Sequence, residues 1–262
     1  MSKLLEGRNA IIYGGGGGIG GGVARAFARE GAGVFLVGRT RDRLDAVAKE
    51  ITASGGSAAV AVLDALDERA VDEHVNEVAT QAGSVDVSFN LITRGDVQGT
   101  PLVDMATDDL LRAVVNGLQS NFITARAAAR RMIEQGSGVI LHLNSASGAG
   151  AMPGMGSTGP ADAATEAFMR YLAAEVGPHG VRVCGLWTAG VAETLSQDKL
   201  SEIGGADTPD PQTIEEMIAG MAALRRTPRL TDVAEAATFL ASDRAAGITG
   251  TMMNVTAGLV LR

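Results

Sequence analysis

The stretch YGGGGGIGGG, from Tyr13 to Gly22, lies between a short apolar run and a segment of helical period. The run before it is RNAIIYG (residues 8–14), and the segment after it is IGGGVARAFAREG (residues 19–31). Glycines at such a junction let the backbone approach a pyrophosphate, and the helix N-terminus offers free N–H groups and a partial positive charge. We therefore interpret the stretch as a strand, a phosphate-binding turn and a helix, rather than a merely flexible turn.

The same alternation of strand and helix continues along the chain, which is typical of a parallel sheet. Further strands are expected at residues 33–37, 58–63, 85–91, 138–143, 181–186 and 251–255. Helices are expected between them at residues 41–53, 68–82, 107–135, 158–176 and 231–241. Together with the first strand, this pattern predicts a single α/β domain over residues 1–262, with a doubly wound seven-stranded parallel sheet.

The pattern loosens between residues 193 and 227. This part contains the flexible sequence GGADTPDP (residues 204–211) and, after it, the amphipathic piece IEEMIAGMAAL. Long irregular segments in compact domains tend to be functional, so we expect residues 193–227 to form a lid-like segment.

Composition excludes several classes of function. The chain has 262 residues, 46 % of them apolar, and a formal net charge of −8, so no global positive field draws it to nucleic acid or to an anionic membrane. Its one cysteine, Cys184, lies in the apolar run VRVCGLW and is expected in the core, and a disulfide framework is excluded. With no signal-peptide pattern and no apolar stretch of about 20 residues, a cytoplasmic location is expected.

The end of the second strand bears on the choice of cofactor. In VFLVGRTRDR, Gly38 stands where a carboxylate would bind the ribose 2′-hydroxyl of NAD, and Arg39, Arg41 and Arg43 follow. An arginine there suits the additional phosphate of NADP. We therefore favour NADP over NAD and expect Arg39 to make the contact, with Arg41 and Arg43 as the solvated start of the next helix.

Several motifs extend this picture over nearly the whole chain. The pattern TGxxxGIG is matched by Tyr13, Gly14, Gly18, Ile19 and Gly20, with Tyr in place of Thr. These and the motifs that follow resemble the short-chain dehydrogenase/reductase family. The resemblance implies these roles: Asp64 contacts adenine, Asn90 is the first Asn of NNAG, Asn116 holds a water of the proton relay, Ser145 is the catalytic Ser, and Thr194 of the PGxxxT-like AGVAET holds the nicotinamide carboxamide.

The resemblance also implies a Rossmann fold, a nicotinamide cofactor and a small-molecule substrate. It implies a homo-oligomer, a dimer or tetramer, that packs through the Ala-rich helices at residues 107–135 and 158–176. Because small residues allow close packing of helices, an apolar face is expected there between subunits.

The family's YxxxK pair is not matched. In GSTGPADAATEAF (residues 156–168), alignment on Ser145 puts Thr158 at the Tyr position and Asp162 at the Lys position. In the family the phenol transfers the substrate proton, and the ammonium lowers the pKa of that phenol and binds the nicotinamide ribose. The Thr158 hydroxyl is too weak an acid, and the charge of Asp162 would raise the pKa of a neighbouring acid. We expect both side chains, one helical turn apart, to face the nicotinamide end of the cleft.

Other chemistries have less support. Strand alternation points His142 away from Ser145, so a Ser-His pair is not expected and His142 is interpreted as a packed residue. His74 and His179 are interpreted as surface residues, and three scattered histidines with one cysteine predict no metal site.

Two functions from different classes remain. The first is an NADP(H)-binding oxidoreductase that obtains its proton from water held by Ser145 and Asn116, from a protonated Asp162, or from the substrate itself. Its substrate would be an activated carbonyl, an imine or an enone. The second is a catalytically inactive dinucleotide-binding protein, acting as a sensor or as the partner of a related subunit. A lyase or isomerase on the same scaffold is a further alternative.

Overall fold

The sheet determines the architecture. The computed structural model describes residues 3–261 and contains seven parallel strands in the order β3-β2-β1-β4-β5-β6-β7. The strands are β1 (Asn9–Tyr13), β2 (Gly33–Gly38), β3 (Ser57–Val62), β4 (Val87–Asn90), β5 (Gly138–Ser145), β6 (Val181–Thr188) and β7 (Thr251–Val255). The predicted single-domain, doubly wound α/β fold is confirmed.

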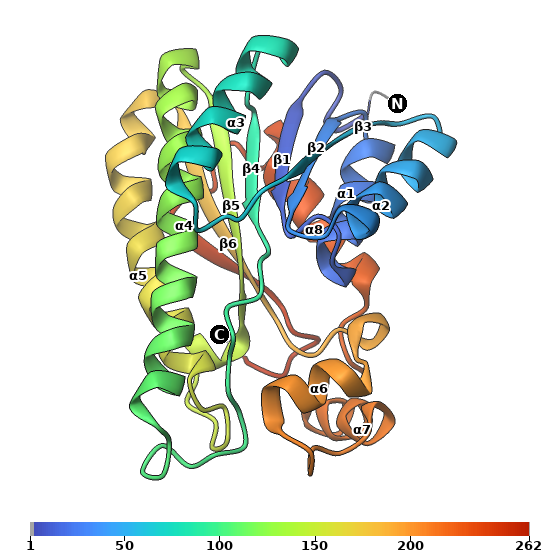
Figure 1. Cartoon of the computed structure of the whole chain (residues 1–262), viewed down its shortest axis with the longest axis vertical. Helices are drawn as coiled ribbons and strands as arrows, with labels where there is room; N and C mark the ends of the chain where they lie inside the picture. The colour runs from blue at the N-terminus through green and yellow to red at the C-terminus, as the bar shows by residue number, and fades with distance from the viewer. Residues whose placement is uncertain (1–2, 262) are drawn as a thin grey trace.

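Helices cover both faces of the sheet (Figure 1). One face carries α1 (Gly18–Arg29), α2 (Arg41–Ala53) and α8 (Leu230–Ala241), and the other carries α3 (Glu68–Ala82), α4 (Thr107–Gln135) and α5 (Thr158–Val176). Each face has its own apolar core, because both faces of the sheet are buried. Short 3₁₀ turns lie at Ala146–Gly148, Gly177–His179, Ala192–Thr194 and Asp243–Ala245.

The strand order reverses between β1 and β4. In doubly wound sheets, ligands bind beyond the carboxyl ends of the strands at this switch point. Gly14, directly after β1, has a φ of +79°, and a Cβ there would lie 2.5 Å from the carbonyl oxygen of Leu91, directly after β4. Only glycine fits this backbone conformation and this close approach, so the two loops meet at the switch point.

Strands β5 and β6 are each two residues longer than expected. Their pairing continues to the register Ser145 beside Thr188, so both residues belong to the sheet rather than to the loops. Ser145 is therefore placed by strand hydrogen bonds at the carboxyl edge, next to the switch point.

The segment at residues 193–227 contains two helices, α6 (Gln197–Gly204) and α7 (Pro211–Met221). Asp210 caps α7, because its carboxylate accepts a hydrogen bond from the Thr213 N–H at 3.0 Å, and Pro211 occupies the first turn. In Figure 1 this segment, in orange, lies beyond the carboxyl end of the sheet and outside the two helical layers.

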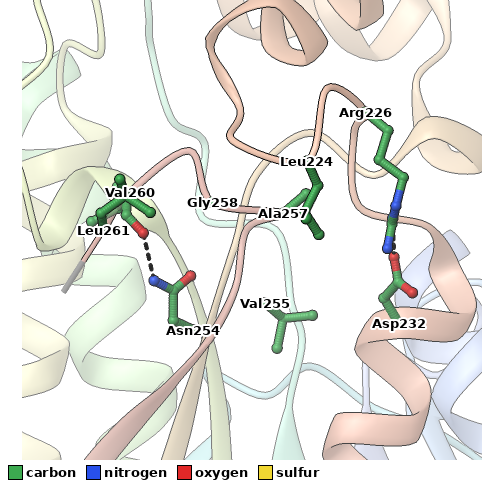
Figure 2. A pocket seen from close by; sticks show the side chains of 9 residues that line it. All are labelled: Leu224, Arg226, Asp232, Asn254, Val255, Ala257, Gly258, Val260 and Leu261. Atoms are coloured by element: carbon green, nitrogen blue, oxygen red, sulfur yellow. Dashed lines mark hydrogen bonds and ion pairs between the residues drawn. The ribbon is translucent and has the colours of Figure 1, made fainter.

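The C-terminal loop supports the base of that segment (Figure 2). The Leu224 N–H donates to the Ala257 carbonyl at 3.0 Å, and Arg226 forms an ion pair with Asp232 of α8. A cavity of about 620 Å³ lies between these residues and Asn254, whose amide donates to the Val260 carbonyl at 2.6 Å. This cavity is lined by neither the glycine run nor Ser145, so it is separate from the switch point.

The burial of the three histidines and the cysteine can be compared with what the sequence predicts. Cys184 and His142 are 1 % and 2 % exposed, and His179 is exposed, as expected. The prediction for His74 is wrong: it is 7 % exposed, because it shares the inner face of α3 with buried valines on either side. No helix within residues 3–261 is both long and apolar enough to cross a membrane.

Candidate active site

The glycine turn presents only backbone to the cleft. A Cβ at Gly20 would lie 2.1 Å from the Gly14 carbonyl oxygen, and the Gly17 N–H donates to that same carbonyl at 2.9 Å. Gly18, Ile19 and Gly20, in the first turn of α1, line a cavity of about 790 Å³. The free N–H groups of the helix therefore face this cavity, as anion binding requires.

A smaller cavity of about 200 Å³ continues the cleft toward β2 and β3. Gly14, Gly38, Arg39 and Asp64 line it, and the Asp64 carboxylate also accepts a hydrogen bond from the Leu66 N–H at 3.0 Å. These residues are brought together because the carboxyl ends of β1, β2 and β3 lie at one edge of the sheet.

The three arginines after β2 differ. Arg41 lies on the surface and pairs with Asp45 at 3.1 Å, as expected for a solvated helix start. Arg43, for which the sequence favoured the same interpretation, instead lines both cavities beside Gly16. Within residues 3–261, neither Arg39 nor Arg43 has an acidic partner at ion-pair distance, so both guanidinium groups are available to an anion.

At the other end of the cleft, Ser145 is bound to Asp162. The Ser145 hydroxyl donates to Asp162 Oδ2 at 2.6 Å, and the Ser145 N–H donates to the same oxygen at 3.1 Å. The Ser147 N–H donates to Ser145 Oγ at 3.2 Å, and the two serine hydroxyls are in contact. Asp162 is therefore a buried partner of Ser145.

The charge of Asp162 is balanced by Arg94, from the loop after β4. Arg94 Nη1 lies 2.6 Å from Asp162 Oδ1, and Arg94 Nη2 lies 2.8 Å from Asp96 Oδ1. The side chain of Asp162 is 0 % exposed, whereas those of Arg94 and Asp96 are 13 % and 14 % exposed and line the large cavity. A guanidinium thus holds two carboxylates beside Ser145.

A helical glycine makes room for this ion pair. A Cβ at Gly117 of α4 would lie 2.7 Å from Arg94 Cδ. Glycine costs about 1 kcal/mol relative to alanine inside a helix, and the close passage of Arg94 explains its presence here. Asn116, the preceding residue, donates from its side-chain amide to the Arg94 carbonyl at 3.1 Å.

Opposing effects act on the pKa of the buried Asp162, and their net result is a pKa above its usual range. Burial raises the pKa of Asp162, and against this the ion pair with Arg94 and the hydrogen bond from Ser145 lower it. Burial lowers the pKa of Arg94, but the carboxylates of Asp162 and Asp96 more than offset this effect, so the pKa of Arg94 is raised. Because Arg94 and the Ser145 N–H can only donate, the geometry stabilises Asp162 as a carboxylate.

Thr158 and Asp162 do not both face the cleft, so that expectation is wrong. They are 4 % and 0 % exposed, and they share a helix face as expected. Asp162 is turned toward Ser145 and Arg94, while the Thr158 hydroxyl accepts a hydrogen bond from Gln98 at 3.0 Å. The loop after β4 therefore contacts both side chains, and neither of them lines the large cavity.

The remaining expected residues surround the large cavity, with one exception. Asn90 and Thr194 line it, and Thr194 packs against Gly18, whose Cβ position lies 2.8 Å from Thr194 Cγ2. Asn116 lines the smaller cavity instead, on the side of Asp64, while Asn121, one turn further along α4, lines the large one.

Known proteins are similar to this chain along nearly its whole length. A family model described as Enoyl-(Acyl carrier protein) reductase matches residues 15–260. The chain belongs to the short-chain dehydrogenase/reductase family. One relative is L-rhamnose 1-dehydrogenase (NAD(P)(+)) of Azotobacter vinelandii, which is 32 % identical with 98 % of each chain covered. Another is Tropinone reductase-like 2 of Erythroxylum coca, which is 31 % identical with 98 % of this chain and 91 % of that chain covered.

A solved structure of a family member has the same fold. It is 7α-hydroxysteroid dehydrogenase complexed with NADH and 7-oxo glycochenodeoxycholic acid, with a TM-score of 0.83, 28 % identity, and 98 % of this chain and 96 % of that chain covered. Membership of the family indicates an oxidoreductase that acts on a small molecule with a nicotinamide dinucleotide cofactor.

The cleft fits such a cofactor. The turn is lined by glycine backbone where a pyrophosphate needs close approach, and Arg39 and Arg43, which have no acidic partner in the described part of the chain, stand at the adenosine end. The buried hydroxyl of Thr188, beside Ser145, has no hydrogen-bond partner within residues 3–261, and it lines the large cavity. A bound ligand would satisfy it. The described residues bring no three His, Cys, Asp or Glu side chains together as a metal site.

The ion pair generates a stability prediction. Arg94→Met should cost about 3 to 5 kcal/mol of unfolding free energy, because it leaves the buried Asp162 charge without its partner. The double variant Arg94→Met/Asp162→Asn should recover part of this loss. Urea unfolding followed by circular dichroism measures both effects.

Arg69→Met is the matched control, because Arg69 pairs with Glu73 on the exposed surface of α3 and its loss should cost about 0.5 kcal/mol or less. An Arg94→Met variant as stable as this control would show that the Arg94–Asp162 pair is not needed to compensate a buried charge.

Proposed function

We propose that this chain is an NADP(H)-dependent oxidoreductase in which Ser145 and Asp162 form the polar pair of the active site. The hydrogen bond from Ser145 Oγ to Asp162 at 2.6 Å, in the cleft that contains the glycine turn, carries this proposal. Counted from Ser145, the resemblance implies that Thr158 and Asp162 stand at the Tyr and Lys positions of the family's YxxxK motif. The reduced cofactor would supply hydride, and the chain's residues would orient the substrate and manage its protons.

This arrangement is a poor proton donor. The one hydroxyl proton of Ser145 is directed to Asp162, and Arg94 favours the ionised form of that acid. The two tyrosines do not supply a phenol: Tyr13, the last residue of β1, is buried with its pKa raised mainly by burial, and Tyr171 is 75 % exposed on α5. Reduction of a simple ketone needs a proton at oxygen, so substrates that are already activated are favoured: activated carbonyls, imines or enones.

The arginines at the adenosine end support NADP. A phosphate on the ribose 2′-oxygen would meet Arg39 and Arg43, which have no acidic partner within the described residues, whereas Gly38 offers no carboxylate to a free 2′-hydroxyl.

We expect NADPH to bind more tightly than NADH, and Arg39→Asp to reverse the order. Loss of a charge-assisted hydrogen bond should weaken NADPH binding about 10- to 100-fold. Titration of cofactor fluorescence measures both affinities. Arg41→Asp changes the same charge two residues away, outside both cavities, and should preserve the order. Equal affinities in the unmodified protein would remove Arg39 from the site.

We also expect little reduction of simple ketones or oxidation of simple secondary alcohols, measured by NADPH absorbance. Thr158→Tyr with Asp162→Lys should raise this activity only if Arg94 is also changed to Ala, because Lys at 162 would otherwise meet the Arg94 guanidinium. General acid catalysis contributes about 10²- to 10⁴-fold.

Two outcomes would change this interpretation. Robust ketone reduction that survives Thr158→Ala and Asp162→Ala but is lost in Ser145→Ala would show that the proton passes through Ser145 and water. Cofactor binding without hydride transfer to any carbonyl, imine or enone would favour the alternative, a catalytically inactive dinucleotide-binding protein.

The segment at residues 193–227 is proposed as the lid of this site. Asp198, Lys199 and Glu202 of α6 line the large cavity, and Glu193 accepts a hydrogen bond from the Leu230 N–H at 2.9 Å, which ties the start of the segment to α8. A helix that covers the cleft from one side is suited to excluding water during hydride transfer.

Assembly into a homo-oligomer is proposed through α4 and α5. Leu111, Val115 and Phe122 are 48 %, 50 % and 42 % exposed and fall on one stripe of α4, and Phe122 packs edge-on against Phe168 of α5, with ring centroids 5.8 Å apart. An exposed apolar stripe of this kind is typical of a subunit interface.

We expect a dimer or tetramer at micromolar concentration in light scattering, and Leu111→Glu with Val115→Glu should shift it toward monomer. Val62→Glu is the control, since Val62 is similarly exposed, at 49 %, on the distant strand β3. A monomeric unmodified protein would contradict the proposed interface.

A further inference from the structure

The substrate end of the cleft contains more negative than positive charge. Arg94 is paired with both Asp96 and Asp162, so one cation faces two carboxylates. These side chains are buried or nearly so, and solvent screens their charges weakly. A negative charge therefore remains uncompensated beside Ser145, and a cation bound there would relieve it.

The Ser145 hydroxyl has no proton left to donate to a ligand in the cleft. A hydroxyl has one proton, and that of Ser145 is directed to Asp162 at 2.6 Å. Its Oγ also accepts a hydrogen bond from the Ser147 N–H at 3.2 Å and contacts the Ser147 hydroxyl, so Ser145 has no free donor for a carbonyl oxygen. A position without a free donor does not favour a carbonyl oxygen, and the carboxylates of Asp96 and Asp162 favour an N–H group or a positive charge.

The opposite wall of the cleft continues this pattern. Helix α6 directs two acids, Asp198 and Glu202, and one base, Lys199, to the cavity. Two positive groups, Arg39 and Arg43, line the other end of the cleft. They lie beside the glycine turn and the adenosine cavity, where the phosphates of the cofactor would bind. Positive and negative charges are thus separated along the cleft.

From this distribution we infer that the substrate is a cation at its reacting centre: an iminium ion in the direction of reduction, and the corresponding amine in the direction of oxidation. This inference rests on the proposed function, because it requires hydride transfer. The step forms a C–H bond between the hydride of the reduced nicotinamide and the iminium carbon, and the π pair of the C=N bond moves to nitrogen. The products are a neutral amine and the oxidised cofactor, and no proton is transferred.

This chemistry accounts for the absence of a phenol at residue 158. A reaction without proton transfer needs no general acid, and the acids that remain serve to bind charge. Because the positive charge on the substrate falls as hydride arrives, Asp96 and Asp162 would stabilise the bound substrate more than the transition state. Their contribution should therefore appear in KM more than in kcat.

The first test uses N-methyl dihydroisoquinolinium, a permanent cation, and tetralone, a neutral ketone of the same ring skeleton, with cyclohexenone as a neutral activated substrate. We expect kcat/KM for the iminium to exceed that for either neutral compound by about 100-fold. Asp96→Asn should lower the preference for the iminium over the enone about 10-fold, mainly through KM, because it removes the surplus negative charge. Asp104→Asn, an equal loss of charge at an exposed position that does not line the large cavity, should leave the preference unchanged.

The second test does not depend on turnover. Calorimetry of the NADP⁺ complex with N,N-dimethyl tetrahydroisoquinolinium and with its neutral carbon analogue should show at least about 10-fold tighter binding of the cation. Two results would overturn the inference and leave the proposed function intact. One is hydride transfer to the enone or ketone but not to the iminium, and the other is equal binding of the two calorimetric ligands. Failure of hydride transfer to every substrate, with NADPH bound, would overturn the proposed function and the inference with it.

Discussion

The ion pair between Arg94 and Asp162 is the interaction on which the arrangement of the site depends. It joins the loop after β4 to the first turns of α5, and it allows a fully buried carboxylate to accept hydrogen bonds from Ser145. Without the guanidinium, the free-energy cost of burying that charge would favour protonation of Asp162 or its displacement from Ser145. Gly117 is required by the same pair, because any side chain there would meet Arg94.

The fold could be predicted from the sequence because its signals are local. The glycine turn, the short apolar strands and the helical periods of α2 to α5 are each contained in a few neighbouring residues, and the bounds of those four helices agree with the structure. His74 was placed wrongly because the charged residues around it conceal the three valines that share its face of α3. Strands β5 and β6 extend further than their apolar runs because Ser145 and Thr188 continue the ladder.

The site could be predicted only in part. Residues that end or closely follow strands, such as Asn90, Ser145 and Asp64, fall in the cleft because the carboxyl ends of parallel strands share an edge. The partner of Asp162 was missed because Arg94 lies 68 residues away and no local pattern links the two. A charged residue in the loop shortly after a buried strand, together with a glycine inside a long helix, was the available signal. Asn116 lines the smaller cavity and its amide is bound to the Arg94 carbonyl, a contact across 22 residues that a sequence motif does not specify.

The charges of the cleft connect the structure to its proposed chemistry. Arginines surround the end where phosphates would bind, and carboxylates outnumber cations at the end where hydride would be transferred. The most direct measurement is a crystal structure of the complex with NADP⁺. It should show Asp162 bridging Arg94 and Ser145, with the nicotinamide beside Ser145 and no contact between Asp162 and the ribose. A structure in which Arg94 turns to solvent and Asp162 binds the ribose hydroxyls would contradict this account of the active site.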